Sequence, residues 1–348
     1  MAKSFIIKLF VFLGLLIGVS LALNELYKSF LRNNYFSYEK DRQFRNYTGK
    51  LEYLLMGDSH IQNGINPEFL ENSFNYAGAW ENYVQTYYKL KNIVEEQKRI
   101  PENIILPVDL GSFTSFRRER FKNDHYWVNY MDYFEVAENF GDRLFINKWI
   151  IGNYFTYAEC YESLFKYLTR KKRENMFPNG FKPCIVRNTE SEERELDGER
   201  IANLYFKNYS YYNSDLGDYF GKMLEFCEQH KIHVILIKMP VAREYCVQAS
   251  GYFSKDSLYN TVGNIIEKHK DNTTLLDYQE LFFDNPEYMY NHDHLNYNGA
   301  NEFTRILSRR LKEGNTPSPD KSGSLPAGRQ VPRRGRIIDC RMAFQSRH

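Results

Sequence analysis

The sequence predicts an α/β fold with a parallel sheet and helices on both of its faces. Short apolar runs that suit buried strands recur along the chain, for example at 52–56, 103–108 and 233–239. Segments with helical periodicity separate these runs, and strands that alternate with helices are typical of parallel sheets. About 280 residues lie between the two unusual ends, enough for one large domain with insertions.

The first part of this domain is expected to supply three strands and one helix. The expected elements are strands at 52–56, 74–77 and 103–108 and a helix at 83–97. The first two strands end at Gly57 and Gly78, which favour turns. Pro107 predicts that the third strand lies at an edge or ends there.

The rest of the domain begins with an irregular segment and then returns to regular alternation. Residues 115–215 are rich in aromatic and charged side chains, and we expect a helical insertion that either covers the site or faces the membrane. The basic run at 170–173 is expected to be a solvated helix end. The remaining expected elements are helices at 219–229, 252–270 and 298–311 and strands at 233–239 and 274–278.

The N-terminal segment is expected to be a transmembrane signal anchor over residues 1–23. Phe5 to Leu23 is almost entirely apolar and has about the length needed to cross a bilayer. A cleaved signal peptide is the alternative, although the stretch before Asn24 is a poor cleavage site. Residues 24–50 are then a juxtamembrane stalk, and the domain at 51–313 lies on the periplasmic or extracellular face.

The segment 314–348 is expected to be a disordered basic tail, because it is rich in Pro, Gly, Ser and Arg and has no periodicity. It accounts for the positive charge of the chain, so the domain itself is mildly acidic. No aromatic interleaving or motif indicates nucleic-acid binding. The five cysteines have no CxxC spacing; one disulfide is possible, and no metal or other cofactor is expected.

Two short strings carry the chemistry. Gly57–His60 (GDSH) places Ser59 after the first strand, and His294 begins the string HLNYNGA before the last helix. A serine hydroxyl needs a base to take its proton, and a histidine from elsewhere in the chain can be that base. Ligands bind at the carboxyl ends of parallel strands, where Ser59, Gly78 and Asp109 are all expected.

Together these strings resemble the first and last conserved blocks of the SGNH/GDSL hydrolase superfamily, over roughly residues 50–312. The resemblance implies a flavodoxin-like three-layer α/β/α sandwich, with Ser59 as nucleophile and His294 as general base. It also implies an oxyanion hole made of the Ser59 amide, a glycine after the second strand and an asparagine side chain. Gly78 fits that glycine by position, and Asn75 or Asn82 is the candidate asparagine.

Two positions depart from the family pattern. The acid usually lies three residues before the histidine, but here that residue is Asn291, which can orient an imidazole and cannot balance its charge. Asp293 is the neighbouring alternative and Asp284 a more distant one, while His292 is an alternative base.

No G-x-N-D string follows the third strand, where Asp109 would put negative charge near the oxyanion unless it binds a substrate hydroxyl. His60 is expected either to line the pocket or to be structural.

The expected function is that of a serine esterase or O-acyltransferase acting through an acyl-enzyme on acyl esters of a cell-surface glycan or on a small ester. In layout the chain is similar to proteins that help D-alanylate teichoic acids or acetylate alginate, which act beside membrane-bound O-acyltransferases. The alternative is a catalytically weak SGNH-like binding or accessory protein in surface-polysaccharide assembly, because Asn291 replaces the acid.

Overall fold

The computed structural model describes residues 2–34, 36–120, 130–140, 143–159, 177–185 and 191–314. The chain divides into two compact units. The smaller unit combines Met1–Asn46 with Lys122–Asn175, and the larger combines Tyr47–Phe121 with Met176–His348. The basic run at 170–173 and the tail from 315 onward lie outside the described residues.

The larger unit is built on a parallel sheet of five strands in the order β2-β1-β3-β4-β5, as the sequence predicts. The strands are β1 (Tyr53–Leu55), β2 (Ser73–Asn75), β3 (Asn103–Pro107), β4 (His233–Lys238) and β5 (Thr273–Asp277). Pro107 is the last residue of β3, and β3 is the central strand. Pro107 therefore marks a strand end and not an edge strand.

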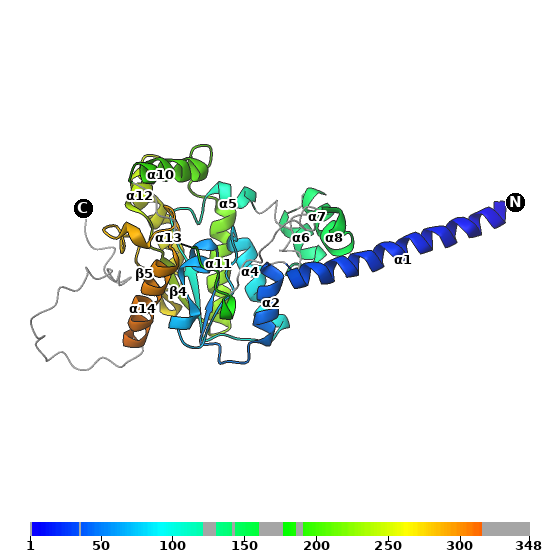
Figure 1. Cartoon of the computed structure of the whole chain (residues 1–348), viewed down its shortest axis with the longest axis horizontal. Coiled ribbons are helices and arrows are strands. Elements are labelled where there is room, and N and C mark those ends of the chain that lie inside the picture. The colour runs from blue at the N-terminus through cyan, green and yellow to red at the C-terminus, as the bar shows by residue number, and fades with distance from the viewer. Residues whose placement is uncertain are drawn as a thin grey trace, which may run out of the picture. The chain divides into compact units, whose positions relative to one another are not determined.

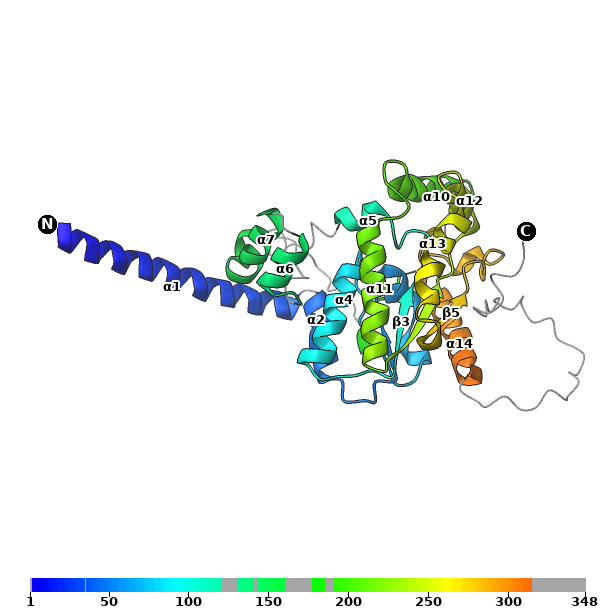
Figure 2. The same ribbon diagram turned by 180° about the vertical axis from the view of Figure 1, so that it is seen from behind.

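Helices cover both faces of this sheet (Figures 1 and 2). The helices of this unit are α3 (Ser59–Gly64), α4 (Tyr83–Lys91), α5 (Ser115–Arg120), α10 (Ser191–Phe206), α11 (Ser214–Gln229), α12 (Arg243–Ser250), α13 (Lys255–Glu267) and α14 (Tyr297–Gly314). Short 3₁₀ turns occur at Pro67–Phe69, Pro178–Gly180, Lys270–Asn272 and Pro286–Tyr288. The helix expected at 83–97 is α4 followed by a π-helical turn at Asn92–Glu96.

The hydrophobic core follows from the alternation of side chains along the strands. Leu55 of β1 and Ile105 of β3 belong to one buried cluster with Ile61 of α3 and Phe303 of α14. Their neighbours in each strand are also fully buried and point to the opposite face, because successive side chains in a strand alternate. On that face α11 contacts α4, α13 and β4, which completes the three layers (Figure 2).

The smaller unit contains α1 (Ala2–Asn34), α2 (Phe36–Asn46), α6 (Tyr133–Phe140), α7 (Arg143–Tyr154) and α8 (Thr156–Glu159). Residues Lys3–Phe30 of α1 are long and apolar enough to cross a membrane, with a mean hydropathy of 2.6, although a signal sequence has the same character. Asn24 of α1 is buried, accepts a hydrogen bond from the Thr156 N–H at 2.8 Å and donates one to the Asn153 carbonyl at 2.9 Å. Residues 24–34 and 36–46 of the segment expected as a stalk are helical, and α8 packs on α1.

The segment expected as one insertion at 115–215 is divided between the units. Residues 130–159 belong to the smaller unit, while α5 and α10 belong to the larger one. Cys184, Cys227 and Cys246 form no disulfide, and Cys160 and Cys340 lie outside the described residues.

Candidate active site

The turn after β1 presents Ser59 at the carboxyl edge of the sheet. Gly57 has φ +108°, and a Cβ at this position would lie 2.4 Å from the Pro107 ring, so only glycine fits without strain. Asp58 then caps α3, and its Oδ1 accepts a hydrogen bond from the His60 N–H at 2.9 Å. Ser59 is the first residue of α3 and is half-buried, which leaves its hydroxyl within reach of a ligand.

His294 lies directly against this serine. Its Nε2 is 2.8 Å from the Ser59 Oγ, although 235 positions separate the two residues in the sequence. The loop that carries His294 is held by Asn296, whose side chain donates hydrogen bonds to the carbonyls of Glu287 and Met289. The fold therefore brings the two sequence strings into contact at one edge of the sheet.

Two side chains, those of Asp293 and Asn291, lie within hydrogen-bond distance of the Nδ1 of His294. The Asp293 Oδ1 is 2.7 Å from Nδ1, while the Asn291 Oδ1 is 3.1 Å away and also accepts the His294 backbone N–H at 2.8 Å. Burial raises the pKa of Asp293, but His294 and His60 outweigh burial and hold that pKa well below its usual range. Asp293 is thus a charged carboxylate at the back of the imidazole, and Asn291 fixes the loop.

The other two candidates from this loop lie elsewhere. Asp284 is exposed and pairs with Arg243 at 2.7 Å. The ring of His292 is buried, and its Nδ1 faces Asp197 at 3.3 Å. The described structure therefore places neither side chain against Ser59.

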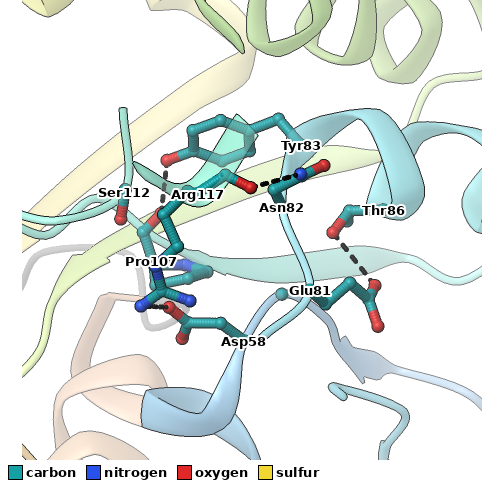
Figure 3. A pocket seen from close by; sticks show the side chains of 9 residues that line it. Asp58, Glu81, Asn82, Tyr83, Thr86, Pro107, Ser112 and Arg117 are labelled. Atoms are coloured by element: carbon teal, nitrogen blue, oxygen red, sulfur yellow. Dashed lines mark hydrogen bonds and ion pairs between the residues drawn. The ribbon is translucent and has the colours of Figure 1, made fainter. Parts of the chain in front are cut away.

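A buried ion pair holds Asp58 in the turn after β1. The Arg117 Nη2 of α5 is 2.7 Å from the Asp58 Oδ2, with both side chains almost completely buried (Figure 3). Burial raises the pKa of Asp58, but Arg117 and His60 outweigh it and lower that pKa below its ordinary value. Because a buried carboxylate without a partner is costly, Arg117 keeps Asp58 available as the cap of α3.

His60 points away from solvent and toward two carboxylates. Its Nδ1 is 2.7 Å from the Asp109 Oδ2, and its Nε2 is 3.5 Å from the Asp293 Oδ2. The other oxygen of Asp109 accepts the Met239 N–H at 2.7 Å. Asp109 is thus buried, and both of its oxygens have partners within the protein.

The oxyanion candidates named from the sequence are used by the fold itself. The Gly78 N–H donates to the Gly57 carbonyl at 2.9 Å. The Asn75 amide donates to the Ile61 and Ile65 carbonyls. The Asn82 side chain caps α4 and donates to the Arg117 carbonyl at 3.1 Å (Figure 3).

The backbone N–H of Ser59 is the remaining candidate of this set. It lies at the first position of α3, where a helix leaves N–H groups without intrahelical partners. It is therefore the donor best placed to meet an oxyanion on a group attacked by the Ser59 hydroxyl.

Among the residues that the structure describes, two clusters have donor atoms close enough together to hold a cation. They are His60 with Asp293 and His294, and Asp58 with His60 and Asp109. In each cluster the carboxylates already contact a protein cation or a hydrogen-bond donor, such as Arg117 on Asp58 and His60 on Asp109. These donor sets are therefore better suited to an internal ion-pair network than to a metal.

Two contributors to the site were not anticipated from the sequence. Arg117 contacts Asp58, and the Tyr205 hydroxyl of α10 donates to the Asp293 Oδ2 at 3.1 Å. Both residues come from the irregular segment 115–215, in which no periodicity or motif distinguishes them. The contacts of Arg117 with Asp58 and of Tyr205 with Asp293 are visible only in the folded structure.

One family model, which carries no descriptive name, matches residues 166–315, less than half of the chain. No curated protein matches the sequence.

Several solved structures match over most of the chain. A putative acylhydrolase from Bacteroides fragilis shares 10% identity, with 79% of this chain and 94% of that chain covered and a TM-score of 0.40. A GDSL-like lipase from Bacteroides thetaiotaomicron shares 11% identity over 80% and 99% of the two chains, with a TM-score of 0.38. A catalytic mutant of an acetylxylan esterase from Geobacillus stearothermophilus shares 11% identity over 76% and 95%, with a TM-score of 0.35. At these scores the likeness to solved structures indicates no function for this chain.

Proposed function

We propose that this protein is an SGNH-type serine hydrolase or acyltransferase that cleaves acyl esters. One observation carries the proposal: an unbroken chain of short contacts from the Ser59 Oγ through both nitrogens of His294 to the Asp293 Oδ1. This is the arrangement that a nucleophilic serine, its base and an orienting carboxylate require. The GDSH and HLNYNGA strings support the same assignment.

The geometry supports a two-step reaction. The Ser59 Oγ attacks the acyl carbon while its proton passes to the His294 Nε2, and the imidazolium is stabilised by Asp293. The Ser59 N–H stabilises the oxyanion. The C–O bond to the alcohol then breaks, the alcohol takes the proton from His294, and the acyl group stays on Ser59. Water or a second hydroxyl then attacks the acyl carbon and gives its proton to His294. The ester bond to the Ser59 Oγ breaks, and His294 returns the proton to the serine oxygen.

We further propose that the substrate is an acyl ester of a cell-surface glycan and that the domain works outside the cytoplasm, tethered by α1. The apolar stretch Lys3–Phe30 and the layout of anchor and hydrolase domain support this location. A membrane-bound O-acyltransferase is the partner that this layout suggests. Full-length protein that fractionates as soluble with its first residues intact would contradict the anchor.

The decisive experiment compares turnover of p-nitrophenyl acetate by the wild-type chain and by Ser59→Ala. We expect the variant to lose activity by about 10⁴-fold or more, because the nucleophile is removed. Ser250→Ala, at an exposed serine whose hydroxyl contacts only the Val247 carbonyl among described residues, is the matched control and should keep full activity. Equal rates for wild type and Ser59→Ala would exclude ester cleavage at this serine.

A second candidate function is a binding or accessory domain of surface-polysaccharide assembly. It is favoured by the oxyanion geometry, since Gly78, Asn75 and Asn82 all donate elsewhere. If this is correct, Ser59→Ala binds an acylated oligosaccharide as tightly as the wild type, and neither protein turns over the ester.

A further inference from the structure

His60 occupies an unusual position between two acids. Its ring is buried, with Nδ1 at 2.7 Å from Asp109 and Nε2 at 3.5 Å from the same Asp293 that supports His294. The rings of His60 and His294 meet edge to face, with centroids 5.1 Å apart. A charge on His60 therefore acts on both His294, the proposed base, and Asp293, the carboxylate beside it.

The surroundings of His60 favour its charged form. Burial lowers the pKa of His60, but the carboxylates of Asp58, Asp109 and Asp293 outweigh burial and raise it well above the ordinary histidine value. The ionisable groups that face it are Asp58 on its own turn, Asp109 after β3, and Asp293 and His294 before α14. Arg117 of α5 pairs with Asp58, and Tyr205 of α10 donates to Asp293.

Asp109, which contacts the Nδ1 of His60, is fixed by residues at the ends of two strands. Asp109 follows β3, and its second oxygen accepts the N–H of Met239, the residue after β4. Its own N–H donates to the Ser112 Oγ at 2.9 Å. Because two neighbouring strand ends fix Asp109, His60 is held by a rigid part of the fold.

We propose that His60 and Asp109 form a positioning pair that holds the Asp293 carboxylate against His294 and sets the pH at which His294 becomes available as a base. The inference rests on the proposed function of Ser59 and His294. Both side chains are buried, so neither is placed to contact a substrate directly. Their effect passes through Asp293, because a flexible or neutral His60 would hold this carboxylate less firmly against His294.

The charges of the cluster explain how the pair works. Three carboxylates, on Asp58, Asp109 and Asp293, face two cations, on Arg117 and His60. The buried cluster therefore carries one net negative charge while His294 is neutral. It becomes neutral when His294 takes the serine proton, which favours the protonated state that the reaction passes through.

The experiment measures the pH dependence of kcat/KM for p-nitrophenyl acetate in wild type, His60→Gln and the double variant His60→Gln/Asp109→Asn. Removal of one positive charge about 5 Å from His294 should move the acid limb of the His60→Gln profile up by roughly one pH unit. The double variant restores the net charge, so its acid limb should return toward that of the wild type. An unmoved limb in His60→Gln, or a double variant shifted as far as the single one, would overturn the proposal.

A second measurement is independent of activity and of whether the variants fold. ¹⁵N NMR of histidine-labelled full-length wild type should show His60 with both ring nitrogens protonated at pH 7.5. A neutral His60 at this pH would overturn the inference. If Ser59→Ala proved as active as wild type while His60 was an imidazolium, the proposed function would fail and the charged pair would remain as a structural ion-pair network.

Discussion

The assignment of Asp293 as the acid can be tested against Asn291, because both contact the same nitrogen. In the proposed reaction the transition state makes His294 an imidazolium, and of these two side chains only Asp293 can balance that charge. At an effective dielectric constant of about 20, two charges about 4 Å apart interact by roughly 4 kcal/mol, close to a 10³-fold effect. Triads that lose this carboxylate lose about 10⁴-fold. We therefore expect Asp293→Asn to lower kcat by about 10³- to 10⁴-fold.

Asn291→Ala should be far milder. It removes the acceptor of the His294 backbone N–H, a hydrogen bond worth about 1 kcal/mol, so a loss of roughly fivefold is expected. The assay is p-nitrophenyl acetate turnover with the Ser59→Ala rate subtracted as background. Asn291→Asp adds a second carboxylate beside Asp293 and should move the acid limb of the profile to higher pH. A loss in Asn291→Ala as large as in Asp293→Asn would refute the assignment of Asp293.

Two further predictions concern the fold that carries the site. Gly57→Ala should lower both the melting temperature and the activity, because φ is +108° and the new Cβ meets the Pro107 ring. The control is Gly263→Ala, whose new Cβ meets nothing within 4 Å. It should be neutral or stabilise the fold by up to about 1 kcal/mol. Asp58 and Asp293 should contribute fully to the free energy of unfolding above their pKa values in the unfolded chain, about 4. This contribution should be lost as the pH falls through their pKa values in the folded protein, which are lower. Melting temperatures between pH 3 and 7 measure this loss, and a wild type that is equally stable throughout would contradict it.

Much of the framework follows from local sequence signals. Apolar runs that end at Gly57 and Gly78 predict buried strands with turns at one edge, and the structure has β1 and β2 there. Parallel pairing then places the residues after β1 and β3 side by side, which is why Ser59, His60 and Asp109 gather in one place. These strands can be predicted because both faces of a parallel sheet are buried, so each strand is a continuous apolar run in the sequence.

The roles of polar side chains could not be predicted in this way. Asn75 and Asn82 have the right residue type for an oxyanion hole, but their amides serve carbonyls of α3 and α5. Whether an asparagine caps a helix or faces a substrate depends on the loop geometry and not on its place in the sequence. Tyr205 contributes through the packing of α10, which no pattern in the segment 115–215 indicated.

The acid beside His294 and the histidine after Ser59 are parts of one solution. Asp293 is only 2% exposed, and a buried carboxylate is costly unless other groups neutralise and hydrogen-bond it. His294 contacts one of its oxygens, while Tyr205 and His60 face the other. His60, held by Asp109, is therefore placed to supply a positive charge on the side of Asp293 away from His294.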